Sequence, residues 1–303
     1  MSEQNTTLRV ENVSKRYGDF TAVNNLSFDV RSGRVFGFLG PNGAGKTTTI
    51  RMIVGITAPD DGFIEMFGKR ISSESQNHIG YLPEERGLYK KMKIVDQLRY
   101  FAALKNVSQS EADKRIDFWL NRMDLAKWKT KKTTDLSKGM SQKIQFISTV
   151  LHDPDLLILD EPFSGLDPVN VEFMIGAVAE LKAQGKTIIF STHLMETAER
   201  LCDDIILINK SRKVIGGTIR EVKQSFGKNL IALRATGGAA VLADKTLVAK
   251  IIEHADEMEL EMATDADAQV LLKRLIEAGA VISKFEQVEP SLNDIFIEKV
   301  KGN

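Results

Sequence analysis

The sequence lacks several features that define whole classes of protein. Cys202 is its only cysteine, which excludes an internal disulfide and leaves too few thiolates for an ordinary structural zinc site. Lysine plus arginine and aspartate plus glutamate are equal at 41 each, so no net field attracts nucleic acid or an acidic membrane surface. We therefore expect no nucleic-acid partner, and a reducing cytoplasm suits the single thiol best.

Long apolar segments and repeats are also missing. No run of about 18 apolar residues occurs, which predicts that the chain does not span a membrane. The first residues, MSEQNTTLRVENV, lack a charged leader followed by an apolar core, so we expect no secretory signal. The absence of a long internal repeat argues against repeat architectures.

What is present predicts an α/β fold. Short apolar strands are expected at residues 35–39, 156–160, 187–192 and 205–209, and helical patterns lie between them. Such alternation predicts a mostly parallel core sheet that is covered on both faces. Alternating residues over 8–30 predict an antiparallel edge sheet, and apolar residues at three- and four-residue spacings predict a helical subdomain over about 93–150.

The pattern weakens near Ser225, which predicts a domain boundary. With 303 residues the chain can hold a first domain at 1–224 and a second at 225–303. In the second, strand-like NLIALRA and helical QVLLKRLIEAGA predict a small α+β domain, and Ser291 with Asp294 predicts a capped last helix. The sequence leaves open whether this domain does more than shield or dimerise the first.

A glycine-rich segment lies between the strand at 35–39 and a helical pattern. It matches G-x-x-x-x-G-K-[ST] at every fixed position through Gly40, Pro41, Asn42, Gly43, Ala44, Gly45, Lys46 and Thr47. Glycines let backbone N–H groups converge on phosphate oxygens, and the helix N-terminus adds partial positive charge. We predict that Lys46 reaches the β and γ phosphates, Thr47 binds Mg²⁺ and Thr48 contacts a nearer phosphate. The alternative is a glycine-rich turn that arose by chance.

Two acids end the strand at 156–160. Ligands of parallel sheets bind at the carboxyl ends of the strands, where Asp160 and Glu161 stand. We predict that Asp160 holds Mg²⁺, directly or through water, and that Glu161 orients or deprotonates the attacking water. Alternatively, both acids cap a following helix. No other metal is expected, because His78, His152 and His254 show no ligand spacing.

Further motifs narrow the class of nucleotide-binding protein. Leu136-Ser137-Lys138-Gly139-Met140, roughly 20 residues before the Asp160 strand, resembles the signature motif of the ATP-binding cassette (ABC) family. Ser164-Gly165-Leu166-Asp167 looks like the D-loop of that family, His193 like its switch histidine and Tyr17 like its adenine-stacking aromatic. Motif order and spacing agree over about residues 6–220. Tyr17 could instead be an ordinary packed aromatic, and His193 a residue with only a structural bond.

The resemblance implies an ATP-hydrolysing subunit that uses ATP and Mg²⁺ and powers a separate membrane permease from the inner face of the cell membrane. Two cassettes of this family sandwich two ATP molecules, so a homodimer or a heterodimer with a related cassette is expected. Ser137 and Gly139 would then contact the γ-phosphate of the partner's ATP, and His193 the γ-phosphate of its own.

This sequence departs from the family pattern at three positions. Lys138 and Met140 replace the usual glycine and glutamine of the signature. Glu84 stands where most cassettes carry a glutamine that senses Mg²⁺ and couples to the membrane subunit, and glutamate can also bind Mg²⁺. The PEERGL segment and the added second domain resemble cassettes of bacterial sodium or drug exporters, which implies export.

Two other functions remain as alternatives. One is a soluble ABC ATPase that remodels a ribosome or DNA complex, although such relatives carry two cassettes, a long coiled-coil insert or a basic patch. The other is a regulatory or scaffold protein with weak turnover, against which Glu161 and His193 argue.

Overall fold

Apolar strands form the central sheet of the first of two units, residues 1–219 and 220–303, into which the chain divides. The structure is a computed structural model and describes residues 6–72, 74–85, 87–226, 230–254, 256–263 and 266–301. Within these residues, no helix combines the length and the apolar character needed to cross a bilayer.

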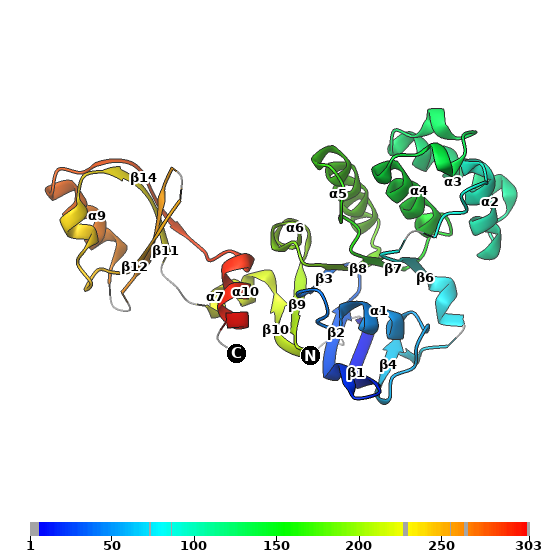
Figure 1. Cartoon of the computed structure of the whole chain (residues 1–303), viewed down its shortest axis with the longest axis horizontal. Coiled ribbons are helices and arrows are strands. Elements are labelled where there is room, and N and C mark those ends of the chain that lie inside the picture. The colour runs from blue at the N-terminus through cyan, green and yellow to red at the C-terminus, as the bar shows by residue number, and fades with distance from the viewer. Residues whose placement is uncertain are drawn as a thin grey trace. The chain divides into compact units, whose positions relative to one another are not determined.

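The central sheet has six strands in the order β10-β9-β3-β8-β7-β6 (Figure 1). All neighbours are parallel except β10 and β9, which pair antiparallel. The strands are β3 (Val35–Leu39), β6 (Ile79–Leu82), β7 (Leu156–Asp160), β8 (Thr187–Thr192), β9 (Asp204–Asn209) and β10 (Arg212–Thr218). Every residue of β3, β7 and β8 is buried, as expected for strands covered on both faces. The predicted parallel core is confirmed.

A second, antiparallel sheet packs against this core. Its order is β2-β1-β4-β5, with β1 (Thr6–Tyr17), β2 (Phe20–Arg31), β4 (Asp61–Met66) and β5 (Lys69–Arg70). Phe28 of β2 meets Phe36 and Phe38 of β3 at ring-centroid distances of 5.4 Å each. One hydrophobic cluster joins this sheet, the central sheet and α1 (Lys46–Ile53), so the phosphate-loop helix stands on a packed core.

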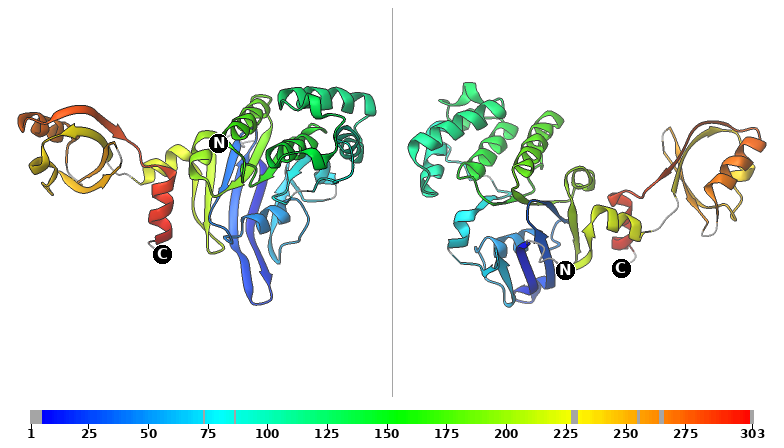
Figure 2. Two further views of the ribbon diagram at one scale, coloured as in Figure 1. Left: turned by 45° about the horizontal axis from the view of Figure 1, so that its top comes forward. Right: turned by 180° about the vertical axis from the view of Figure 1, so that it is seen from behind.

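Helices and short 3₁₀ segments complete the first unit. Their bounds are η1 (Glu74–His78), α2 (Ile94–Leu104), α3 (Gln109–Arg122), η2 (Ala126–Trp128), η3 (Thr133–Asp135), α4 (Lys138–Val150), α5 (Pro168–Ala183) and α6 (Met195–Leu201). Helices α2, α3 and α4 lie side by side as the predicted helical subdomain (Figure 2). Ser108 and Ser137 cap α3 and α4, because their hydroxyls accept from Glu111 N and Met140 N.

The second unit has its own antiparallel sheet and core. Its elements after α7 (Ile219–Ser225) are β11 (Leu230–Thr236), α8 (Ala239–Leu242), β12 (Val248–Glu253), β13 (Met258–Met262), α9 (Ala268–Glu277), β14 (Val281–Val288) and α10 (Leu292–Lys301). The strand order is β12-β13-β11-β14, and Leu271 and Leu275 of α9 are fully buried in the cluster that covers the sheet. Ser291 and Asp294 exchange backbone-to-side-chain bonds of 3.3 and 3.2 Å at the start of α10, which confirms the predicted cap.

Candidate functional site

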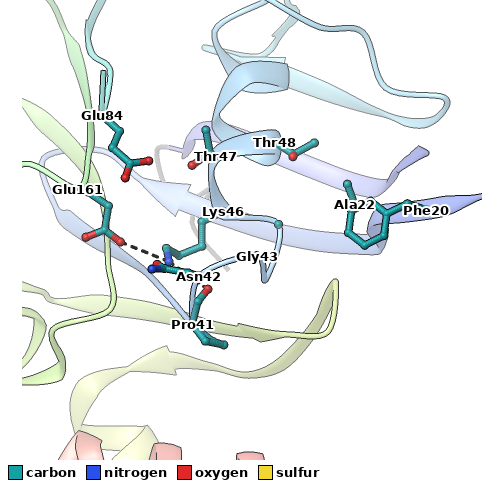
Figure 3. Close-up of a pocket in the computed structure, with 11 residues that line it drawn as sticks. Phe20, Ala22, Pro41, Asn42, Gly43, Lys46, Thr47, Thr48, Glu84 and Glu161 are labelled. Atoms are coloured by element: carbon teal, nitrogen blue, oxygen red, sulfur yellow. Dashed lines mark hydrogen bonds and ion pairs between the residues drawn. The ribbon is translucent and has the colours of Figure 1, made fainter. Parts of the chain in front are cut away.

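A cavity of about 400 Å³ opens where β3 leads into α1 (Figure 3). Lys46, Thr47 and Thr48 of α1 lie in its middle, with Glu84 and Glu161 on one side and Phe20 and Ala22 on the other. The complete lining is Phe20, Ala22, Pro41, Asn42, Gly43, Gly45, Lys46, Thr47, Thr48, Glu84 and Glu161. The glycine-rich loop, one acid after β7 and Glu84 therefore meet in one cavity.

The loop packs so tightly that side chains are excluded at two of its glycines. Gly45 is left-handed at φ 107°, and a Cβ there would lie 2.4 Å from the carbonyl oxygen of Ala22. A Cβ on Gly40, at φ 153°, would lie 2.3 Å from the carbonyl oxygen of Ile208. Both contacts are far shorter than a carbon–oxygen van der Waals distance. The loop can therefore hold its backbone N–H groups near the cavity only with glycine at these positions.

Lys46 places a buried positive charge in the cavity. The residue is 5% exposed, and its Nζ donates to the carbonyl oxygens of Gly40 at 2.8 Å and Pro41 at 3.3 Å. The same atom lies 3.3 Å from Oε1 of Glu161, which is 7% exposed. A buried cation held on carbonyl oxygens can turn to an anionic ligand, because phosphate oxygens satisfy it better.

Asp160 keeps an oxygen without a partner. The residue is fully buried, its Oδ1 accepts from Ser191 Oγ at 2.5 Å, and its Oδ2 has no hydrogen-bond partner among the described residues. Burial raises the pKa of this carboxyl, while the hydroxyls of Ser191 and Thr47 act to lower it. A buried carboxylate oxygen beside a threonine hydroxyl is a donor set that fits a hard cation such as Mg²⁺.

Glu161 is held in a strained conformation by its neighbours. Its φ is +47°, which is left-handed and unfavourable for a residue with a side chain. Its N–H donates to Ser191 Oγ at 2.9 Å, and each of its carboxylate oxygens lies 3.1 Å from Nδ1 of His193. The structure therefore brings the predicted residues Asp160, Glu161 and His193 together through Ser191 and a direct contact.

Sequence reasoning missed Ser191 and Phe20. Ser191 bonds both acids, and the only signal for it was the polar end of an otherwise apolar strand, TIIFST. Phe20 lines the cavity, whereas Tyr17 is not among the lining residues, although the two are cross-strand partners at the β1–β2 turn. The adenine-stacking role of Tyr17 stays a prediction.

Ser137 and Gly139 lie at the start of α4 and do not line this cavity. Ser137 is the N-cap of that helix, so its hydroxyl and the first N–H groups lie together at one helix end. Beside them, the Lys138 ammonium lies over Gly165, where an added Cβ would be 2.1 Å from Nζ. The signature-like segment and the D-loop-like segment are therefore neighbours within one copy.

The loop after β6 carries Glu84 and borders a second cavity. Gln145 of α4 donates from Nε2 to the carbonyl oxygen of Glu85 at 3.1 Å. Pro83, Gly87 and Leu88 line a groove of about 270 Å³ that runs against α2 and α4. Arg86 of the PEERGL segment lies outside the described residues. One loop thus forms a wall of both cavities.

The chain is similar over nearly its whole length to proteins of one kind. Residues 23–164 match the family described as ABC transporter, and residues 217–300 match the family described as ATP-binding protein DrrA1-3-like, C-terminal domain. The uncharacterized ABC transporter ATP-binding protein YhaQ of Bacillus subtilis (strain 168) is 46% identical over 97% of this chain and 98% of its own length. The Nod factor export ATP-binding protein I of Ralstonia nicotianae is 37% identical over 75% of this chain and 74% of its own.

Solved structures resemble about three quarters of the chain. One described as the ATP binding subunit of an ABC transporter has a TM-score of 0.69 at 33% identity and covers 73% of this chain and 94% of its own. A nucleotide-free ATP-binding cassette has a TM-score of 0.65 at 22% identity over 73% of this chain and 95% of its own, which shows the same fold.

Proposed function

The chain belongs to the ATP-binding subunits of ABC transporters, and on that premise we propose which residues act on ATP and in which direction transport runs. Its function is to bind and hydrolyse ATP to power transport. The remodelling of a ribosome or DNA complex is not favoured, because the relatives carry transporter names. Export is the direction we propose, and the relatives named for Nod factor export support it.

The assignment rests on one observation, the ion pair between Lys46 and Glu161 beside the glycine-rich loop. Backbone N–H groups of residues 42–45 would hold the phosphates, Lys46 would turn from Glu161 to the β and γ phosphates, and Thr48 would contact a nearer phosphate. Thr47 and the unpartnered Oδ2 of Asp160 would hold Mg²⁺, with Glu84 facing the same cavity. The cation neutralises phosphate charge when it is bound.

Glu161 is the residue we assign to the attacking water. As Lys46 turns to the phosphates, the carboxylate loses its cationic partner and becomes free to accept a proton from a water molecule. His193 Nδ1, 3.1 Å from both carboxylate oxygens, would fix the direction of that carboxylate. Its other ring nitrogen remains available to the γ-phosphate.

A second cassette completes the site in our proposal. Ser137 and Gly139 lie outside the cavity but at the N-terminus of α4, where a hydroxyl, N–H groups and helix polarity favour an anion. We assign them to the γ-phosphate bound by a partner copy or a related cassette. ATP would then join two copies, and hydrolysis would release them.

The permease is the partner that we place on the groove of about 270 Å³. Apolar side chains, among them Ile79, Leu88 and Phe101, line it, and its wall includes the loop that presents Glu84 to the nucleotide cavity. A permease segment in the groove would act on that loop directly. The subunit would thus lie at the inner face of the cell membrane.

The substitution Glu161→Gln tests the assignment. It keeps the size of the side chain but removes its basicity, so ATP should still bind while turnover falls about 10²- to 10⁴-fold. In the presence of ATP the variant should also accumulate as a dimer, and light scattering measures the amount of dimer. Glu277→Gln, a matched change at a side chain that is 62% exposed on α9, should change neither quantity. Normal turnover in Glu161→Gln would remove Glu161 from this role.

A further inference from the structure

Two short segments of the first unit carry seven lysines and contain no acidic residue. They are Lys90-Lys91-Met92-Lys93, just before α2, and Lys127-Trp128-Lys129-Thr130-Lys131-Lys132, just before η3. The chain as a whole is balanced at 41 basic and 41 acidic residues, so this concentration of positive charge is local. We call the two segments together the lysine surface.

The backbone holds the two segments against each other. Ile94 N donates to the carbonyl oxygen of Lys131 at 2.9 Å, and Lys93 pairs with Lys132 in an isolated antiparallel bridge. Directly opposed residues of an antiparallel pair have Cβ atoms about 4.5–5.5 Å apart on the same face, so the side chains of Lys93 and Lys132 are neighbours. Like charges in such a pair are destabilising. The fold therefore keeps two positive charges together where an uncharged pair would be more stable.

Most of these charges have no acidic partner. Lys129 is held by Asp117 at 2.5 Å, whereas Asp135 accepts from the backbone N–H of Lys132 at 3.2 Å. The other six lysines are exposed and make no ion pair with any described residue: Lys90, Lys91, Lys93, Lys127, Lys131 and Lys132. Six ammonium groups on two adjoining segments are therefore available to an anionic partner.

The lysine surface adjoins the groove that we assign to the permease. Leu88 and Phe101 line that groove, and the residues next to them, Tyr89 and Tyr100, are 50 and 42% exposed with ring centroids 5.8 Å apart. Tyrosine is enriched where a membrane meets water, because its ring is apolar and its hydroxyl is polar. Since Tyr89 directly precedes Lys90, the aromatic pair leads from the groove to the lysines.

We propose that the lysine surface binds anionic phospholipid headgroups of the membrane that holds the permease, an inference that rests on the proposed place of the subunit beside that permease. Ammonium groups attract lipid phosphates without a defined pocket, and each lysine near an anionic bilayer raises affinity about fivefold. A nucleic acid is the less favoured partner, because the surface begins at the wall of the permease groove. Lipid contact would hold the subunit at the bilayer while a permease segment occupies the groove.

Sedimentation of the full chain with lipid vesicles, without nucleotide or permease, tests this surface. At about 0.1 M salt the chain should bind phosphatidylglycerol vesicles and should bind neutral phosphatidylcholine vesicles far more weakly. Lys93→Gln combined with Lys132→Gln should weaken binding to phosphatidylglycerol about 25-fold, at about fivefold for each lysine. Lys93→Arg combined with Lys132→Arg keeps both charges and should bind like the unmodified chain.

The matched control is Lys69→Gln combined with Lys273→Gln. It removes the same charge at exposed side chains on β5 and α9, and its affinity for phosphatidylglycerol should stay within about twofold of the unmodified chain. Raising the salt concentration from about 0.1 to about 1 M shortens the screening length from about 10 to about 3 Å. The same rise should therefore release the unmodified chain from the vesicles.

The outcomes separate the lipid surface from the ATP site. Equal binding by the unmodified chain and the Lys93→Gln, Lys132→Gln variant overturns the proposal, as does equally tight binding to phosphatidylcholine. Single-stranded RNA that binds more tightly than phosphatidylglycerol at equal phosphate concentration, and more weakly to the same variant, would identify a nucleic-acid site instead. ATP turnover in solution needs no lipid, so this variant should retain it. An unmodified chain without turnover would contradict the proposed ATP site, and the vesicle results would still decide the role of the lysines.

Discussion

The two units of the chain treat their charged side chains in different ways. In the first, Lys46 and Glu161 face each other at 3.3 Å with 5 and 7% of their side chains exposed, and Asp160 is fully buried. In the second, the ion pairs seen between described residues, such as Arg274 with Asp244, leave at least 31% of each side chain exposed.

This difference distinguishes the unit that holds charged residues in a buried site from the unit whose charged residues remain at the surface. Removing an ion from water costs several kcal/mol, so a fold retains buried charges only where partners or ligands compensate them. Exposed pairs contribute little, about 0–1 kcal/mol each. We therefore expect substitutions of the buried charged residues in the first unit to lower ATP turnover, and substitutions of the exposed charged residues in the second unit to leave it almost unchanged.

After Glu161, the largest expected effect is at Lys46. Lys46→Ala removes the cation that we assign to the β and γ phosphates and should lower ATP turnover about 10²- to 10³-fold. Lys273→Ala, the same change at a side chain that is 77% exposed on α9, should leave turnover within about twofold of the unmodified chain. Steady-state phosphate release measures both. Equal losses of ATP turnover in the two variants would contradict the expected difference between the units.

A core substitution in the second unit should lower the stability of that unit with little effect on ATP turnover. Leu275 is fully buried in the cluster over that sheet, and Leu275→Ala should destabilise the second unit by about 2–5 kcal/mol. Because the first unit has its own core, ATP turnover at 25 °C should stay within about twofold. Calorimetry gives the unfolding temperature and phosphate release the turnover, with the 72%-exposed Val281→Ala as control. A proportional loss of turnover would mean that the cores are coupled.

Acid should destabilise the first unit through His152. Burial lowers the pKa of this imidazole to about 4, and its Nε2 lies 3.0 Å from the carbonyl oxygen of Ile79. The folded state therefore binds fewer protons than the unfolded state between about pH 6.5 and 4, and this contribution to stability is lost as pH falls through that window. Since the ring is partly exposed, we expect a loss of about 1–2 kcal/mol by pH 5.

Urea unfolding at pH 7 and pH 5 measures this loss. His152→Gln keeps a donor for the carbonyl oxygen of Ile79 but cannot titrate, so its stability should fall less over the same interval. An identical pH dependence in both chains would exclude His152 as the cause.

The smallest expected effect concerns two glycines with similar left-handed backbone conformations. Gly43 of the phosphate loop and Gly279 after α9 have φ of +80° and +73°, and a Cβ at either would meet nothing within 4 Å. Alanine should therefore cost about 1 kcal/mol of unfolding free energy at both. Only Gly43→Ala should also weaken ATP binding, since Gly43 lines the cavity. Equal ATP affinity in the two variants would argue against the loop as the phosphate site.

Much of the fold follows from patterns along the chain. The glycine-rich loop and the Asp160–Glu161 pair each follow an apolar strand, and carboxyl ends of parallel strands share one edge, so their proximity could be predicted. The predicted antiparallel edge sheet and the small α+β domain are likewise confirmed. All of these depend on periodicity, which a sequence carries directly.

Details that depend on register could not be predicted. Ser191 reaches both acids because it pairs with Asp160 across β7 and β8, and that pairing requires the strand order. In the sequence, Phe20 and Tyr17 are simply two aromatic residues that flank a two-residue turn. Only the folded hairpin shows that Phe20 is the one that borders the cavity. The Lys46–Glu161 pair likewise appears only once loop and strand are folded.

The loop that carries Glu84 on one side and Pro83, Gly87 and Leu88 on the other has a thermodynamic consequence. If a permease segment in the groove raises the affinity for ATP by some factor, ATP must raise the affinity for that segment by the same factor. The membrane partner would then regulate the ATPase as well as being driven by it. This reciprocity is measurable by titrating ATP in the presence of the permease segment, and the permease segment in the presence of ATP.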